Sequence, residues 1–152
     1  MKIKYLKLKS WLLVALGGLV GVNLSSCVME CEYGCPEGTY HIKGTVTNVK
    51  GEPIEGIAVV NAYESSDGYV MSEYGLDTTG PDGRYEVSVY GLPDWPSPVG
   101  FRDIDDEQNG SYNDKVVPVS APSEAFYGGD GNWNRGFANV ELNVTLTEKT
   151  NK

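Results

Sequence analysis

Side chains that can bind a metal ion gather in one acidic segment, residues 103–114. Carboxylate and amide oxygens recur at every second residue and again at the end of this segment, at Asp103, Asp105, Glu107, Asn109 and Asp114. Hard oxygen ligands at such intervals can wrap a calcium ion, and the EF-hand loop uses similar offsets. The segment departs from that loop because Gln108 stands where the loop needs glycine and Asp114 replaces its bidentate glutamate. We therefore predict either a calcium site or a solvated acidic loop, the usual state of such charge clusters.

Tryptophan occurs in two segments that are rich in loop-forming residues. Trp95 lies among prolines, and Trp133 lies in the long glycine-rich stretch 122–136. Exposed rings beside Asn and Asp can stack on sugars, whereas buried rings would plug the ends of a small domain and supply much of its apolar burial. A loop as long as 122–136 is expected to be functional or mobile. Trp95 and Trp133 are therefore the candidate binding residues.

Residues for catalysis are few. His41 is the only histidine, so Ser–His–Asp hydrolysis would have a single candidate base, placed at the start of a predicted strand. Glycoside hydrolysis needs two acids across a cleft, and the abundant acids include Glu73, Asp77, Asp103 and Glu107, although the sequence does not place two of them across a cleft. We expect a protein that is not an enzyme, with a secreted hydrolase as the alternative.

The first 26 residues have the layout of an export signal. Four lysines without any acid precede the apolar run 11–22, and Ser25 and Ser26 come directly before Cys27. A membrane-spanning helix needs roughly 20 apolar residues, so this run is too short to span. We predict a signal peptide over residues 1–26, and a short retained anchor helix is the alternative.

The stretch Leu24-Ser25-Ser26-Cys27 resembles a bacterial lipobox. The resemblance implies cleavage before Cys27 and attachment of two or three acyl chains to this cysteine, which hold a protein firmly to a membrane where one chain would not. In such lipoproteins an aspartate directly after the cysteine retains the protein in the inner membrane. Val28 stands there instead, which implies the outer membrane, on its periplasmic or its outer side.

Cleavage of the leader makes the chain strongly acidic. Without the four lysines of the leader, 8 of the 12 basic residues face 21 acidic ones, giving a net charge of −13 on 126 residues. Nucleic-acid binding requires a basic face that neutralises phosphates, so this balance argues against it. It favours a self-repelling surface that projects from the membrane.

Two cysteines remain if Cys27 carries lipid, Cys31 and Cys35. In an exported protein such a pair most simply forms one disulfide, and Gly34 permits the tight loop that it requires. The spacing Cys27-x3-Cys31-x3-Cys35 also suggests a metal or iron–sulfur site, but an acylated Cys27 and the single histidine argue against it. We predict a Cys31–Cys35 disulfide within a lipidated tether, residues 27–38.

Residues 39–149 predict one all-β domain. Alternating or continuous apolar runs of strand length are separated by Gly and Pro turns, without a helical period. We expect strands over residues 40–46, 56–63, 69–78, 84–90, 99–104, 115–119 and 140–147. Pro118 places its strand at an edge, and alternation requires a core face formed by Val140, Leu142, Val144 and Leu146. About seven short strands describe a β-sandwich of the Ig-like or transthyretin-like type.

Two motifs support a family resemblance. Gly51-Glu52-Pro53-Ile54-Glu55-Gly56-Ile57 and Thr79-Gly80-Pro81-Asp82-Gly83-Arg84-Tyr85 follow a first strand. Their order resembles the carboxypeptidase regulatory-like (transthyretin-like) domain and covers residues 40–90. The resemblance implies the sandwich fold.

A narrower resemblance includes the flanking segments. The lipobox, Cys31-Glu32-Tyr33-Gly34-Cys35-Pro36 and Phe101-Arg102-Asp103-Ile104-Asp105 together resemble the radical SAM-associated lipoproteins of Bacteroidetes-type bacteria. We therefore expect a lipid-anchored binding or scaffolding module that engages an envelope protein or a glycan. The alternative is a protein substrate or partner of a neighbouring radical SAM enzyme.

Overall fold

The computed structural model of the chain describes residues 35–105 and 108–150, which belong to the compact unit Cys35–Lys152. The predicted signal peptide, Cys27 and Cys31 lie outside the described residues. Within the described ranges no helix is long and apolar enough to cross a membrane.

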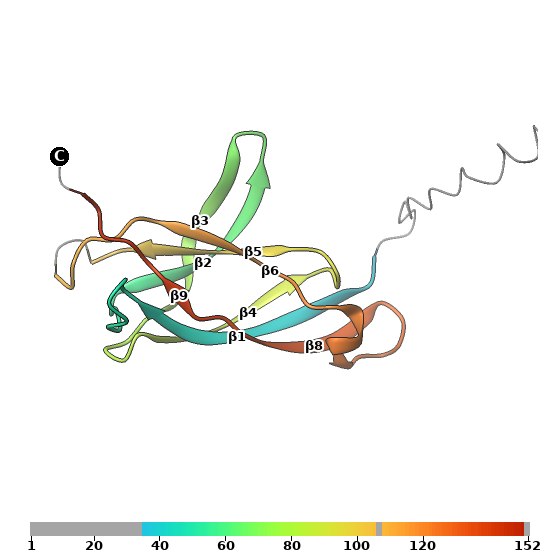
Figure 1. Cartoon of the computed structure of the whole chain (residues 1–152). Coiled ribbons are helices and arrows are strands. Elements are labelled where there is room, and N and C mark those ends of the chain that lie inside the picture. Colours follow the sequence, from blue (N-terminus) through green and yellow to red (C-terminus); the bar gives the residue numbers. More distant parts are fainter. Residues whose placement is uncertain (1–34, 106–107, 151–152) are drawn as a thin grey trace, which may run out of the picture. The chain divides into compact units, whose positions relative to one another are not determined.

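The domain is a sandwich of two β-sheets (Figure 1). The β1 sheet has the spatial order β4 (Arg84–Gly91), β1 (Glu37–Thr47), β8 (Asn134–Glu141) and β7 (Tyr127–Gly128), and β9 (Val144–Thr145) pairs with the end of β1. The β2 sheet has the order β3 (Gly68–Thr78), β2 (Ile57–Ser65), β5 (Ser97–Asp103) and β6 (Lys115–Val119). A 3-10 turn, η2 (Ser123–Ala125), precedes β7.

The predicted all-β class is confirmed, and so are the places of two strands. The apolar run at the start of β2 is buried on both faces, and β2 is an internal strand of its sheet, between β3 and β5. β6 is an edge strand, where Pro118 removes no ladder hydrogen bond. The described residues form nine strands instead of about seven, because two-residue strands such as β7 and β9 are too short to show a period.

The core lies between the two sheets. Tyr40 and Ile42 of β1 and Phe101 of β5 are fully buried. The rings of Tyr85 and Phe101 meet edge to face across the sandwich, with centroids 5.4 Å apart, a geometry that aromatic pairs prefer.

The turn before β4 explains the residue types of the Thr79–Tyr85 motif. The hydroxyl of buried Thr79 donates to the Ile54 carbonyl at 2.7 Å and accepts the Ile57 N–H at 2.9 Å. Gly83 has φ of 70°, and a Cβ there would lie 2.6 Å from the Val46 carbonyl oxygen. Only glycine fits that position without strain, so the turn fixes the start of β4.

The prediction of one continuous strand over residues 140–147 is wrong. β8 ends at Glu141 and β9 begins at Val144, because the chain crosses close to β1 between them. The Leu142 carbonyl accepts the Tyr85 hydroxyl at 2.7 Å, and the Asn143 side chain accepts the Thr45 N–H at 2.9 Å in place of a backbone acceptor. Alternation correctly predicts which side chains of this segment face the core. Val144 and Leu146 are buried, and Val140 and Leu142 are partly buried and pack against the core.

This crossing leads to a stability prediction for Gly44. A Cβ at Gly44 would lie 1.8 Å from the Leu142 carbonyl oxygen, whereas a Cβ at Gly75 would meet no atom closer than 3.9 Å. Gly44→Ala is expected to lower the free energy of unfolding by roughly 1–3 kcal/mol, as overpacking does, and Gly75→Ala is the control. Urea unfolding of the mature protein measures both, and equal stability of the two variants would contradict the close approach.

Candidate functional site

The main hollow in the described part of the chain is a groove of about 820 Å³. One wall is β4, which is the edge strand of its sheet, and the facing wall is the β2–β3 hairpin. The loop between β4 and β5 and the first residues of β5 complete the lining. Its aromatic residues are Tyr63 of β2, Tyr69 of β3, Tyr90 of β4 and Trp95 of the loop.

These four rings are exposed. Trp95 keeps 67% of its surface accessible, Tyr90 keeps 80%, and Tyr63 and Tyr69 are also exposed. Trp133 in the β7–β8 loop is 55% exposed. The interpretation that Trp95 and Trp133 plug the ends of the sandwich is therefore wrong, and both remain candidate binding residues.

The free edge of β4 directs backbone polar groups into the groove. The Glu86 N–H, on this edge, donates to the Asp77 side chain at 2.8 Å. Alternate residues of an antiparallel strand direct their backbone groups to the same side, so Ser88 and Tyr90 face the same edge as Glu86. The groove thus combines aromatic faces with backbone donors and acceptors, as ligand pockets commonly do.

The loop that carries Trp95 is held in a strained conformation by Asp94. Asp94 has φ of 66°, in the left-handed region that Asp adopts more readily than most residues. Its backbone N–H donates to the Ala121 carbonyl at 3.1 Å, and its carboxylate accepts the backbone N–H and the hydroxyl of Ser123. These contacts join the backbone directly before Trp95 to the segment 121–123.

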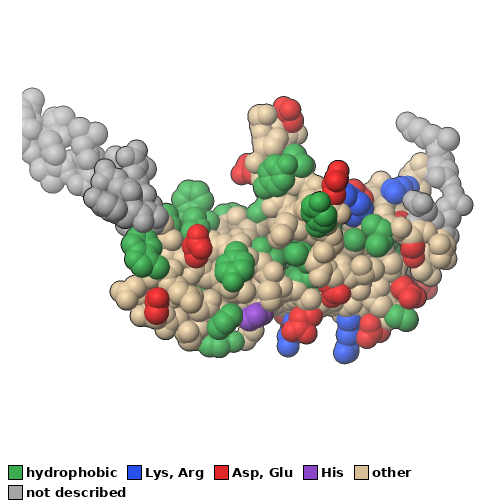
Figure 2. Space-filling view, turned by 180° about the vertical axis from the view of Figure 1, so that it is seen from behind, with side chains coloured by type: hydrophobic (Ala, Val, Ile, Leu, Met, Phe, Trp, Pro, Cys, Tyr) green, Lys and Arg blue, Asp and Glu red, His purple; other side chains and the backbone are tan. Residues whose placement is uncertain are grey.

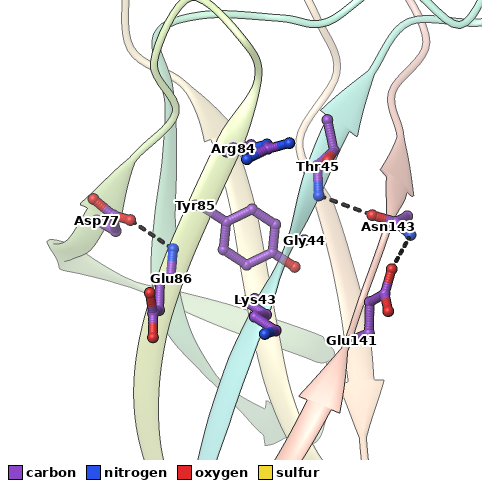
Figure 3. A pocket seen from close by; sticks show the side chains of 9 residues that line it. All are labelled: Lys43, Gly44, Thr45, Asp77, Arg84, Tyr85, Glu86, Glu141 and Asn143. Atoms are coloured by element: carbon purple, nitrogen blue, oxygen red, sulfur yellow. Dashed lines mark hydrogen bonds between the residues drawn. The ribbon is translucent and has the colours of Figure 1, made fainter.

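A second, polar hollow of about 550 Å³ lies over β1, β4 and the β8–β9 crossing (Figure 3). It is lined by two cations and three acids, which are Lys43, Arg84, Asp77, Glu86 and Glu141. Figure 3 shows Asp77 bonded to the Glu86 backbone and Glu141 bonded to Asn143. Cations and acids alternate in this lining, and it contains one aromatic ring, Tyr85, which is buried. The groove with its exposed rings is therefore the candidate site.

The acidic side chains of segment 103–114 bond to different groups. Asp103 is buried and accepts the Tyr112 N–H at 2.7 Å, Asp105 accepts the Asn109 side-chain amide at 2.5 Å, and Asp114 lies 3.4 Å from the Arg102 guanidinium. Glu107 lies outside the described residues. Among the described residues, no three His, Cys, Asp or Glu side chains come together as a metal site would require. The calcium site stays a prediction.

Asp103 has one carboxyl oxygen, Oδ1, that is buried without a hydrogen-bond partner. Burial raises the pKa of Asp103, the Tyr112 N–H opposes that rise, and the neighbouring Asp105 carboxyl raises the pKa further. The fold therefore makes the ionised form of Asp103 less favourable than it is for an aspartate in water.

His41 lies opposite Ser88 in the β1–β4 pair, with 2.9 Å between Nδ1 and Oγ. Its ring also stacks on Phe137 at 4.9 Å. Among the described residues no carboxylate hydrogen bonds to this ring, and both side chains stand on the outer face of the sheet. A nucleophile–base pair needs a third group that orients the base, so the contact does not support hydrolysis.

The predicted disulfide is described at one end only. Cys35 is disulfide-bonded, and its expected partner Cys31 lies outside the described residues. The Cys31–Cys35 pairing stays a prediction.

Sequence reasoning missed three of the four groove aromatics. The sequence does contain a signal for Tyr90. In the alternating pattern of β4 it stands on the polar, outward-facing side, after Arg84, Glu86 and Ser88, where an aromatic residue is unexpected. Tyr63 and Tyr69 carry no such signal, since they line the groove only because the β2–β3 hairpin extends beyond the sheet.

Comparisons with known proteins add little to this geometry. No protein-family model matches the chain, and no curated protein sequence is significantly similar to it, so the family resemblances of its motifs stay predictions. Among solved structures, a streptococcal ancillary pilin is 13% identical with a TM-score of 0.40, over 72% of this chain and 32% of that chain. BcpA, the major pilin subunit of Bacillus cereus, is 15% identical with a TM-score of 0.37, over 74% and 29%. The chain thus spans about a third of the length of these pilins, and similarities this weak carry no information on function.

The raised pKa of Asp103 predicts a pH-dependent effect of Asp103→Asn. An acid whose folded pKa lies above its unfolded pKa costs stability as pH rises through those values, and costs nothing when both states are protonated. Asparagine can still accept the Tyr112 N–H but cannot ionise, so its stability relative to wild type should increase from acid to neutral pH. Thermal melting across pH, with a chelator present, measures this difference.

Asp103→Ala is the matched variant. It leaves the buried Tyr112 N–H without an acceptor, so it should be less stable than Asp103→Asn by roughly 1–3 kcal/mol, and by the same amount at every pH because neither side chain ionises. A stability difference between wild type and Asp103→Asn that is independent of pH would show that Asp103 ionises normally in the fold.

Proposed function

We propose that this chain is a non-enzymatic, lipid-anchored binding module of the cell envelope, and that its ligand is a neutral glycan held in the groove. The groove with four exposed aromatic rings carries this proposal. The anchor is supported by the lipobox resemblance and by the leader that precedes it.

The chemistry of the groove suits a sugar chain. A saccharide ring has apolar C–H faces and a rim of hydroxyl groups, so it can pack on aromatic faces while its hydroxyls bond to polar groups at the edge. Asn61 and Ser88 line the groove beside the rings, as does the free edge of β4. The net charge of −13 expected for the mature chain disfavours acidic polymers.

The same lining supports binding without hydrolysis. Glycosidases of the usual kind place two carboxyl groups across the scissile bond. Of the residues that line the groove, only Glu64 carries a carboxylate. A bound glycan would therefore be held without being cleaved.

The anchor is tested by the mass of the mature protein from its native host. We expect an N-terminus at residue 27 carrying acyl chains, and full-length precursor in cells whose lipoprotein signal peptidase is inhibited. A mature protein that retains its opening lysines would refute the anchor. A mass beyond that of lipid and one disulfide would instead favour modification by a radical SAM enzyme.

The groove is tested by calorimetric titration with neutral oligosaccharides prepared from the host envelope. Tyr63→Ala combined with Tyr69→Ala should weaken binding at least about tenfold, since truncating a central aromatic contact costs upwards of 1 kcal/mol. Tyr74→Ala is the control, because Tyr74 is an exposed tyrosine of the same strand as Tyr69 outside the groove lining. Absence of oligosaccharide binding, or equal affinities of all variants, would refute a glycan site here.

A further inference from the structure

The two tryptophan loops lie on either side of the strand by which the domain continues toward its N-terminus. Glu37 begins β1, and its backbone N–H donates to the Trp133 carbonyl at 2.8 Å. On the other side of β1, Gly38 lies opposite Gly91, directly before the loop that carries Trp95. Figure 1 shows the β4–β5 connection and the η2–β8 segment at the end of the sandwich where β1 begins.

More exposed aromatic surface continues beside Trp133. Tyr127 of β7 and Phe137 of β8 are both exposed, and their ring centroids are 6.5 Å apart. Figure 2, seen from behind, shows hydrophobic side chains on the surface toward this end, with acidic side chains between them.

Both tryptophan loops are held by an aspartate. Asp94 is bonded to Ser123 in the first loop. In the second, the Asp130 carboxylate accepts the N–H groups of Asn132 and Asn134 at 2.8 and 3.0 Å. These two backbone N–H groups lower the pKa of Asp130, so it stays ionised and keeps the turn closed. The rings are therefore presented without an ordering cost at the moment of contact.

The chain length before β1 keeps this end close to the proposed anchor. Seven residues separate Cys27 from Cys35, so the two are joined by eight residue-to-residue steps, and a fully extended chain of eight steps spans at most about 29 Å. Tethering raises the effective concentration of a nearby surface into the millimolar range. At such a concentration, a contact between the domain and the membrane can form even if it would be too weak to bind an untethered domain from solution.

We propose that the Trp95 and Trp133 loops rest on the headgroup region of the membrane that holds the lipid anchor. Tryptophan favours this interface because its ring is apolar and its indole N–H is polar. This inference rests on the lipidation proposed above.

Charge selects the kind of lipid. The exposed carboxylates Glu37, Asp94, Glu124 and Asp130 outnumber the exposed cation Arg135 beside Trp133, so a zwitterionic surface is favoured over an anionic one. With Trp95 at the membrane, the glycan proposed above would pack on the other three rings of the groove, Tyr63, Tyr69 and Tyr90, and would enter from the end beside Tyr63 and Tyr69.

The experiment uses the tryptophan fluorescence of the mature lipoprotein in phosphatidylcholine vesicles. Trp11 is removed with the signal peptide, so Trp95 and Trp133 are the only tryptophans of the mature chain. Trp133→Phe and Trp95→Phe each leave one reporter. Both reporters should lose most of their emission when the lipids carry bromine on the acyl chains close to the headgroup.

A tryptophan at the opposite end is the control. Val49 is exposed in the turn after β1, and Val49→Trp in a chain with both native tryptophans changed to Phe should not be quenched. Adding anionic lipid should weaken quenching of the native reporters at low salt, and salt should restore it because the repulsion is screened.

The outcomes separate the inference from the anchor. A protein whose mass shows no acyl chains removes the anchor and the membrane contact together. A lipidated protein whose two reporters are not quenched, or in which only one is quenched, overturns the two-loop contact and leaves the anchor intact. Quenching that increases with anionic lipid would contradict the role of the four carboxylates.

Discussion

Tyr40 connects the parts of this domain that carry the exposed tryptophan loops. It is fully buried in β1, and its hydroxyl donates to the Leu92 carbonyl at 2.9 Å. Its ring meets the Phe126 ring edge to face, with centroids 5.2 Å apart. Burial raises the pKa of Tyr40, so the hydroxyl remains a donor at neutral pH. One residue of the central strand thereby fixes the start of the loop that carries Trp95 and the segment that leads to β7.

The central position of β1 also explains why the exposed aromatics gather where they do. β1 is paired on both sides, with β4 on one side and β8 on the other, so its first residue necessarily lies between the loops that adjoin those strands. In a lipoprotein of the proposed kind, the anchored end of the domain is then the end with the most exposed rings. The groove begins there at Trp95 and continues along β4 to the hairpin, so the proposed membrane contact and the proposed glycan site occupy adjoining parts of one domain.

The acidic segment shows how tertiary context changes the meaning of a pattern. Alternating carboxylates suggest converging ligands, but a buried Asp103, an Asp105 bonded to Asn109 and an Asp114 beside Arg102 serve different partners. Burial of a carboxylate beside another acid disfavours its ionised form. The spacing of side chains along the chain therefore does not reveal which of them share one environment.

The sequence alone determined the all-β class, the edge position of Pro118 and the turn between Thr79 and Tyr85, because side-chain period, the missing proline N–H and the conformational freedom of glycine are local properties. It also supplied the lipobox and the two candidate tryptophans. Only the tertiary structure decided that the last strand breaks beside Gly44, that Tyr63 and Tyr69 face Tyr90 across a groove, and that Trp95 and Trp133 flank the start of β1. Those relations join residues that are distant in sequence. They depend on the order of the strands in the sheets and on the direction of the β2–β3 hairpin, and neither of these produces a periodic pattern in the local sequence.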